Sequence, residues 1–388
     1  MANKEVKIIL ITGYLGAGKT TLLNHILAND EGIRAAVIVN DIGEVNVDAA
    51  LIQQGGLSQT TGDLVPLTNG CICCSLSEDF SKQLFSLATS GKFDYIVIEA
   101  SGICEPIPIA YNIAAVCEQS QQFAASAAGL GDARTTVSLD LDNLVAVVDA
   151  ARMVDEFAGG EALLSENIDD EDIEALLIQQ IEFCTTVVLN KADLVSPEQL
   201  EEVKAIVRAL QKDAVIVEAV NAEVPMAELL NTGRFDFNEA YNSAVWIDAM
   251  EHPEEHEEEE VLEYDISTFV YQRRKPFDYG AFCDQMATWP LNVIRVKGTF
   301  WSTDDLDMCC IFEAVGKQQP TLMENGLFVD SAPEGEKEKL LAENPWLLED
   351  WDPVVGDRET KLVFIGRHMD SEAIIAGLDS ALTEYVPE

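Results

Sequence analysis

The sequence has no long hydrophobic run and few basic residues. No stretch of about 18 or more uncharged apolar residues is present, and no early apolar stretch is flanked like a signal peptide. Lys and Arg number 24 against 69 Asp and Glu, which gives a formal net charge of −45 at pH 7. This charge would repel a phosphate backbone. We therefore expect a soluble, cytoplasmic protein with no membrane span and no nucleic-acid partner.

The sequence also lacks the cysteine pattern of a secreted disulfide protein. It has nine cysteines, an odd number, and three of them are crowded at Cys71, Cys73 and Cys74. A reducing compartment would keep these three thiols available. The remaining thiols apart from Cys104 are interpreted as core or incidental residues: Cys117, Cys184, Cys283, Cys309 and Cys310.

A strand, a glycine-rich turn and a helix are predicted at the start of the chain. The apolar residues 6–11 precede the sequence GYLGAGKT at 13–20, and a helix-like segment follows. Backbone N–H groups of such a turn can surround phosphate oxygens. Lys19 would reach the β- and γ-phosphates, and the Thr20 hydroxyl would hold Mg²⁺. The predicted nucleotide contacts are Gly13, Gly16, Ala17, Gly18, Lys19, Thr20 and Thr21.

A second loop predicts which nucleotide is bound. Asn190, Lys191 and Asp193 follow the strand-like residues 185–189, and open α/β sheets bind ligands at the carboxyl ends of their strands. The aspartate can accept hydrogen bonds from guanine N1–H and the exocyclic amine. The lysine stem can cover the ring, and the asparagine can tie the loop together. Adenine offers no such pair of donors, so the loop favours GTP over ATP.

The crowded thiols predict a site for a transition metal. Zn²⁺ accepts Cys sulfur in a tetrahedron, and Cys71, Cys73 and Cys74 would leave one position open. That position could take water, a buffer ligand, Glu44 or Cys104. Two other interpretations stay open at this point: a buried cluster of small apolar residues, and a redox-active pair of thiols.

These motifs together resemble the CobW-like metal-handling GTPases, and the resemblance covers nearly the whole chain. A family of this kind would hydrolyse GTP with Mg²⁺ and serve as a metallochaperone or a metallocofactor-insertion factor. Its partner would be a client metalloprotein or metallocofactor enzyme. The segments that carry the resemblance are 13–23, 40–48, 69–74, 98–102, 190–193, 293–301 and 362–367.

The resemblance implies further roles. Asp41 would begin a switch segment, 41–48, that takes part in catalysis, and Glu99 would be the carboxylate that approaches Mg²⁺. The Gly102 N–H would meet the γ-phosphate. Three alternatives stay open for Glu44, which could contact the metal, the attacking water or only solvent. No arginine finger is obvious, although Arg152 or a partner's arginine could supply one.

The chain departs from the family pattern in three places. Cys104 replaces a small apolar residue and is interpreted as either a fourth metal ligand or a buried structural thiol. Residues 118–141, rich in Gln, Ser and Ala, read as an insertion. The segment 251–260 has two histidines among seven glutamates where relatives carry a histidine-rich stretch. Such a charge run is typical of a solvated connector, and metal capture is the alternative.

The alternation of elements predicts an α/β fold of the P-loop type: a doubly wound, mainly parallel sheet, with a smaller C-terminal α+β domain. The expected boundaries are a GTPase domain at 1–245, an acidic linker at 246–262 and the second domain at 263–388. Expected strands are 36–40, 95–99, 144–149, 187–190, 215–218, 265–271, 293–299, 309–315 and 362–366. Expected helices are 80–89, 173–183, 197–211, 277–288 and 371–382.

The expected function is delivery of a metal under nucleotide control. Zinc is the first choice of cargo, Co²⁺ for a corrinoid or nitrile-hydratase-like client the second, and iron the third. The alternatives are a regulatory GTPase scaffold whose thiol loop is structural, and a redox sensor. The client and the oligomeric state, including a homodimer, are left open by the sequence.

Overall fold

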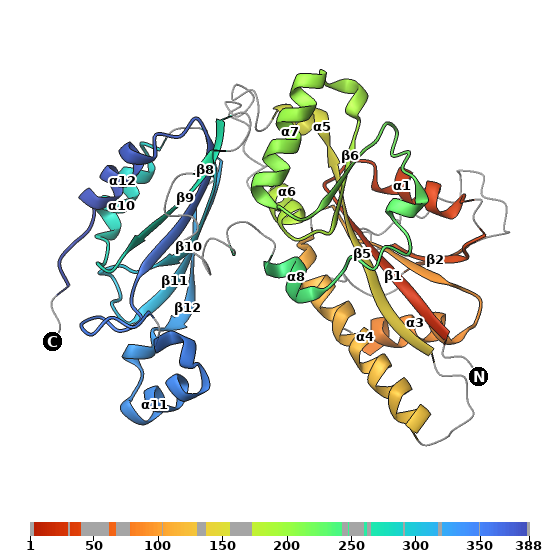
Figure 1. Ribbon diagram of the computed structural model, residues 1–388, viewed down its shortest axis with the longest axis horizontal. Coiled ribbons are helices and arrows are strands. Elements are labelled where there is room, and N and C mark those ends of the chain that lie inside the picture. The colour runs from red at the N-terminus through yellow and green to blue at the C-terminus, as the bar shows by residue number, and fades with distance from the viewer. Residues whose placement is uncertain are drawn as a thin grey trace. The chain divides into compact units, whose positions relative to one another are not determined.

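The computed structural model describes most of the chain as two compact units. The first contains the described residues between 4 and 155 and between 175 and 242, and the second contains those between 260 and 385 (Figure 1). Of the expected linker at 246–262, only Ile247, Glu260 and Val261 are described. The described residues are 4–29, 32–39, 62–66, 78–102, 104–129, 137–155, 173–242, 247, 260–261, 265–289, 292–316, 320–348 and 350–385.

The first unit is built on a seven-stranded sheet in which all paired strands are parallel. The strand order is β3-β2-β4-β1-β5-β6-β7. This confirms the predicted doubly wound α/β fold. The strands are β1 (Lys4–Thr12), β2 (Ala35–Val39), β3 (Gly62–Pro66), β4 (Tyr95–Glu99), β5 (Val137–Asp149), β6 (Thr186–Asn190) and β7 (Val215–Glu218).

Helices flank this sheet because its central strands are apolar on both faces. Ile8 and Leu10 point to one face and Ile9 and Ile11 to the other, and all four are fully buried. The helices are α1 (Lys19–Leu27), α3 (Glu78–Thr89), α4 (Pro106–Gly129), α5 (Ala150–Met153), α6 (Ile173–Glu182), α7 (Pro197–Leu210) and α8 (Phe237–Asn242).

Helix α7 begins where the sequence predicts. The Ser196 hydroxyl accepts a hydrogen bond from the Gln199 backbone N–H at 3.3 Å, and the Gln199 side chain accepts one from the Ser196 N–H at 2.9 Å. Pro197 occupies the first turn, where its missing N–H costs nothing. The predicted start of this helix at residue 197 is confirmed.

Most of the segment 118–141, which the sequence predicts to be an insertion, is regular structure of the first unit. Helix α4 continues to Gly129, and β5 begins at Val137. Ser120 and Ala124 are almost fully buried, in line with Ile113 and Val116 earlier in the helix. The Ser120 hydroxyl accepts a hydrogen bond from the Leu139 N–H at 2.8 Å. Small side chains thus form the buried stripe of this helix, so no hydrophobic period is visible in the sequence.

The second unit is a six-stranded antiparallel sheet with helices, as expected for the α+β domain. Its strand order is β12-β11-β10-β13-β9-β8. Aromatic residues fill its core, with Phe277 stacked on Phe300 at 5.4 Å between ring centroids. The strands are β8 (Glu260–Val261), β9 (Ile266–Arg273), β10 (Val293–Phe300), β11 (Met308–Val315), β12 (Thr321–Leu327) and β13 (Thr360–Arg367). The helices are α10 (Tyr279–Met286), α11 (Glu334–Glu343) and α12 (Ser371–Ser380).

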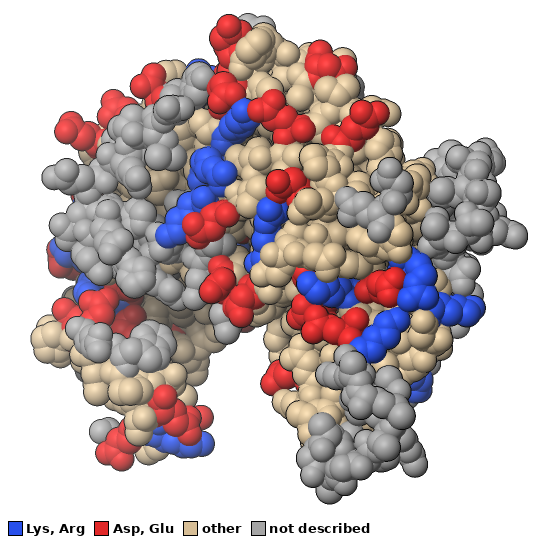
Figure 2. All heavy atoms as spheres, turned by 45° about the vertical axis from the view of Figure 1, so that its right-hand side comes forward, with Lys and Arg blue, Asp and Glu red and all other residues tan. Residues whose placement is uncertain are grey.

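On the face seen in Figure 2, many of the basic side chains lie beside acidic ones. Arg34 and Asp94, for example, lie 2.8 Å apart, and this contact lowers the pKa of the Asp94 carboxyl below its usual range. Among the described residues, no helix is both long and apolar enough to cross a membrane.

Candidate functional site

The glycine-rich turn lies between β1 and α1, at the carboxyl end of β1. Gly13, Gly16 and Gly18 all have positive φ angles, of 136°, 78° and 112°. At Gly18 a Cβ atom would lie 2.4 Å from the Asn190 side-chain nitrogen. The turn therefore needs glycine here both for its backbone conformation and for the close approach of Asn190.

Lys19 places a positive charge over this turn. Its Nζ donates a hydrogen bond to the Gly13 carbonyl at 2.7 Å and to the Tyr14 carbonyl at 3.3 Å. The side chain is buried even though it is charged. A buried ammonium at the amino end of a helix is a suitable partner for an anion such as a phosphate.

Thr20 and Glu99 bring two oxygen atoms together beside Lys19. The Thr20 hydroxyl donates to the Glu99 Oε1 atom at 3.3 Å, and Glu99 is only 2% exposed at the carboxyl end of β4. Mg²⁺ prefers oxygen ligands and is commonly held by a hydroxyl, a carboxylate and nucleotide phosphates. The side chains present therefore fit this ion.

Asn190 connects the predicted base-binding loop to the phosphate loop. It is 3% exposed at the carboxyl end of β6. Its amide nitrogen donates to the Ala17 carbonyl at 2.8 Å, and its amide oxygen accepts from the Ala222 N–H at 2.7 Å. Three loops, which follow β1, β6 and β7, are thereby held together at one edge of the sheet.

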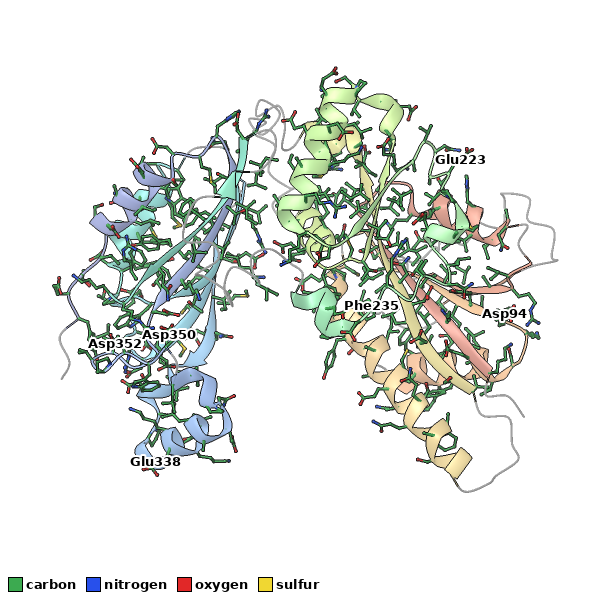
Figure 3. The ribbon with its side chains drawn as sticks, in the orientation of Figure 1. Asp94, Glu223, Phe235, Glu338, Asp350 and Asp352 are labelled. Carbon is green, nitrogen blue, oxygen red and sulfur yellow. The ribbon has the colours of Figure 1, made fainter. Side chains whose placement is uncertain are left out.

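Lys191 and Asp193 leave this junction in different directions. Lys191 has a left-handed backbone conformation, with φ of 60°, and its ammonium forms an ion pair with Asp149 at the end of β5. Asp193 is exposed in the short 3₁₀ turn Ala192–Leu194. Its carboxylate is thus accessible to a ligand. Glu223, in the loop after β7, and Asp94, just before β4, are labelled in Figure 3.

Gly102 lies against the phosphate loop. A Cβ atom on Gly102 would be 2.8 Å from the Leu15 backbone nitrogen, so no side chain fits between the two segments. The Gln180 side chain donates to the Gly102 carbonyl at 3.3 Å and to the Cys104 carbonyl at 3.4 Å. Cys104 is 2% exposed. The segment after β4 is therefore fixed next to the nucleotide-binding turn.

The predicted nucleotide contact Thr21 lies in the first turn of α1. Five predicted site residues fall in other parts of the chain. Asp41, Glu44, Cys71, Cys73 and Cys74 lie outside the described residues. Within the part of the chain that is described, no three His, Cys, Asp or Glu side chains are grouped so that they could hold a metal ion. Whether Cys104 is a metal ligand thus stays a prediction.

The structure adds Asp149 and Tyr14 to the residues around the site. The Arg152 guanidinium lies over the Tyr14 ring, 4.2 Å from its centroid. Asp149 pairs in register with Asn190 across β5 and β6. Sequence reasoning missed Asp149, although a carboxylate at the end of a predicted strand was a usable signal.

Two family models match this chain. Residues 7–218 match the nucleotide-binding domain described as CobW/HypB/UreG, and residues 266–382 match the cobalamin synthesis protein cobW C-terminal domain. The chain belongs to the CobW family. The resemblance stated from the motifs is therefore confirmed, and the first unit of this CobW-family protein is a nucleotide-binding domain.

Named relatives of the CobW family cover most of the chain. A zinc-regulated GTPase metalloprotein activator 1 from Dictyostelium discoideum is 31% identical over 96% of this chain and 78% of its own length. A zinc chaperone CobW from a Sinorhizobium species is 32% identical over 80% of this chain and 86% of its own. The zinc chaperone YjiA of Escherichia coli K12 is 27% identical over 96% and 97%.

Proposed function

We propose that this protein is a Mg²⁺-dependent GTPase that binds zinc and delivers it to a client metalloprotein. Relatives named as zinc chaperones and as a zinc-regulated GTPase support the activity and the cargo. The structural observation that carries the proposal is the junction at Asn190, which joins a phosphate loop to a loop of the guanine-binding type.

In this proposal the nucleotide lies along the carboxyl edge of the first sheet. Lys19 binds the β- and γ-phosphates, Thr20 binds Mg²⁺, and Glu99 orients the ion or its water shell. Asp193 accepts hydrogen bonds from the guanine base. The Gly102 N–H meets the γ-phosphate, which its contact with Leu15 supports.

In the same proposal, the metal is bound by the thiol loop. Cys71, Cys73 and Cys74 bind the zinc ion, and Glu44 or Cys104 completes the site. Asp41 belongs to the switch segment that responds to the γ-phosphate. The position of Cys104, two residues beyond Gly102, supports communication between the two sites, because Gln180 donates a hydrogen bond to each of the two backbone carbonyls.

The GTPase assignment is tested by nucleotide binding and turnover of the full chain. We expect hydrolysis of GTP in the presence of Mg²⁺, and affinity for GDP well above that for ADP. Lys19→Ala should lower turnover by roughly 10²-fold or more, the usual loss when one preorganised charge-stabilising group is removed from an active site. Equal binding of adenine and guanine nucleotides would contradict the assignment.

The cargo is tested by metal analysis of protein purified without oxygen. The wild-type protein should retain zinc, and the variant in which Cys71, Cys73 and Cys74 are all changed to Ser should lose it. Equal zinc content in the two proteins would remove the thiol loop from the proposal. The variant should still hydrolyse GTP when the nucleotide is saturating.

A further inference from the structure

Asp149 uses its two carboxylate oxygens on different partners. One oxygen accepts a hydrogen bond from the Arg152 backbone N–H at 3.1 Å and so caps helix α5. The other oxygen forms the ion pair with the Lys191 ammonium. The Asp149 side chain is 15% exposed and that of Lys191 is 33% exposed, so water screens this pair only in part.

The ion pair with Asp149 fixes the direction of the Lys191 side chain. A lysine side chain has a flexible four-carbon stem, and fixing it costs conformational entropy. Its backbone is in the left-handed region, which sets the direction in which the stem leaves the loop. With the ammonium held by Asp149, the stem runs across the junction between the base loop and the end of β5.

The Asp149 carboxylate is also linked to the phosphate loop, through Arg152. Arg152, whose N–H it caps, lies over the ring of Tyr14, the second residue of that loop. The Tyr14 ring is buried, so this contact is protected from water. Asp149 therefore stands between the loop predicted to bind the base and the loop predicted to bind the phosphates.

From these contacts we propose that Asp149 is a positioning residue for nucleotide binding. Its carboxylate holds the Lys191 stem along the guanine ring, and by capping α5 it keeps Arg152 against the phosphate loop. The proposal rests on the proposed binding of GTP and GDP. Asp149 itself touches neither the base nor the phosphates.

The chain offers a substitution that separates the two partners of Asp149. Asn caps helices about as well as Asp, so Asp149→Asn keeps the hydrogen bond from Arg152 and removes the ion pair. Lys191→Met keeps the apolar stem and removes the ammonium. Asp149→Ala removes both the hydrogen bond from Arg152 and the ion pair with Lys191. Asp155→Asn, at an exposed carboxylate just after α5, makes the same change of charge and is the matched control.

The test is titration of the full-length variants with a fluorescent GDP, together with steady-state hydrolysis of GTP. We expect Asp149→Asn and Lys191→Met each to raise the Kd for GDP by roughly five- to tenfold, with the double variant no weaker than either. The KM for GTP should rise with kcat within about twofold. Asp149→Asn should leave the unfolding temperature unchanged, whereas Asp149→Ala should lower it.

The outcomes separate this proposal from the proposed function. A wild-type protein that binds no guanine nucleotide would contradict the proposed function itself. A wild-type protein that binds GDP, with Asp149→Asn and Lys191→Met as tight as Asp155→Asn, would overturn the positioning role. Losses that add in the double variant would also overturn it, because two residues acting as one pair cannot be additive.

Discussion

One amide side chain, that of Asn190, holds three loops of the nucleotide-binding domain together. The sequence analysis expected Asn190 to stabilise its own loop. The structure shows that its partners, Ala17 and Ala222, are 173 and 32 residues away along the chain. The type of residue was visible in the motif, but these partners were not, because backbone groups of distant loops leave no mark in a sequence.

This junction yields a prediction at the scale of single atoms. Asn190→Ala should lower the free energy of unfolding by roughly 1–3 kcal/mol, because the Ala17 carbonyl and the Ala222 N–H lose their partner in a buried site. Asn190→Asp keeps the acceptor for Ala222 and loses the donor to Ala17, so it should also weaken GDP binding. Urea unfolding and GDP titration measure the two effects.

If Asn190→Ala had wild-type stability and wild-type affinity for GDP, the hydrogen bonds of Asn190 would contribute neither to folding nor to GDP binding. Asn221→Ala is a poor control, since Asn221 itself has a left-handed backbone. The exposed Asp193→Asn is better, because it should alter nucleotide preference without lowering stability.

At the scale of elements, Asp142 in β5 fixes the loop 231–235 to the opposite, amino end of the sheet. Its fully buried carboxylate accepts hydrogen bonds from Lys7 at 2.9 Å, the Tyr95 hydroxyl at 3.0 Å and the Gly233 N–H at 2.8 Å. This loop leads through Phe235, labelled in Figure 3, into α8. Phe235 packs edge-on against Phe183, with ring centroids 6.4 Å apart.

The hydrogen bonds of the buried Asp142 carboxylate predict how the free energy of unfolding depends on pH. Burial alone would raise the pKa of Asp142, but the hydrogen bonds from Gly233, Lys7 and Thr232 outweigh burial and hold the pKa below its usual value. A group with a depressed pKa in the folded state stabilises the protein above its unfolded pKa, about 3.9 for Asp. This stabilisation is lost as the pH falls through the folded-state pKa.

Asp142→Asn should therefore destabilise the protein near pH 7 by roughly 1.5–3 kcal/mol, the usual value for hydrogen bonds to a charged group. The difference from the wild-type protein should begin to shrink as the pH falls below about 3.9, where the carboxyl of the unfolded chain takes up a proton. Urea unfolding between pH 7 and pH 3 measures this. A difference that stays constant over that range would contradict an ionised Asp142 in the folded protein. Asp213→Asn, at an exposed carboxylate, is the control for a change of charge alone.

Several elements with a buried, apolar stripe were predicted well, whereas α4, β12 and α11 were missed. The buried stripe of α4 includes the small side chains of Ser120 and Ala124. Strands β4 and β7 have the predicted bounds, and α3, α6 and α12 differ by one or two residues. Strand β12 was missed because all of its side chains are exposed and its pairing with β11 depends on backbone groups. Helix α11 was missed because its sequence, EGEKEKLLAE, has almost no apolar face.

At the scale of the whole molecule, the sequence predicted the fold class and the order of the motifs. These follow from strong local signals, namely glycines at a turn and apolar strands. The contacts made by Asp149 and Arg152 could not be predicted, since they depend on how β5 and β6 align. The thiol loop of the CobW-family protein lies outside the described residues, so its link to the nucleotide stays a prediction.

The central claim is that nucleotide and zinc each alter the binding of the other. By thermodynamic linkage, a factor by which GTP tightens zinc binding must equal the factor by which zinc tightens GTP binding, and couplings of about 1–3 kcal/mol are typical. The direct measurement is the Kd for a non-hydrolysable GTP analogue, with and without Zn²⁺, in the wild-type protein and in the triple variant at Cys71, Cys73 and Cys74. We predict that zinc lowers the Kd by roughly 5- to 150-fold in the wild-type protein and leaves it unchanged in the triple Ser variant. An identical Kd in all four conditions would contradict the account.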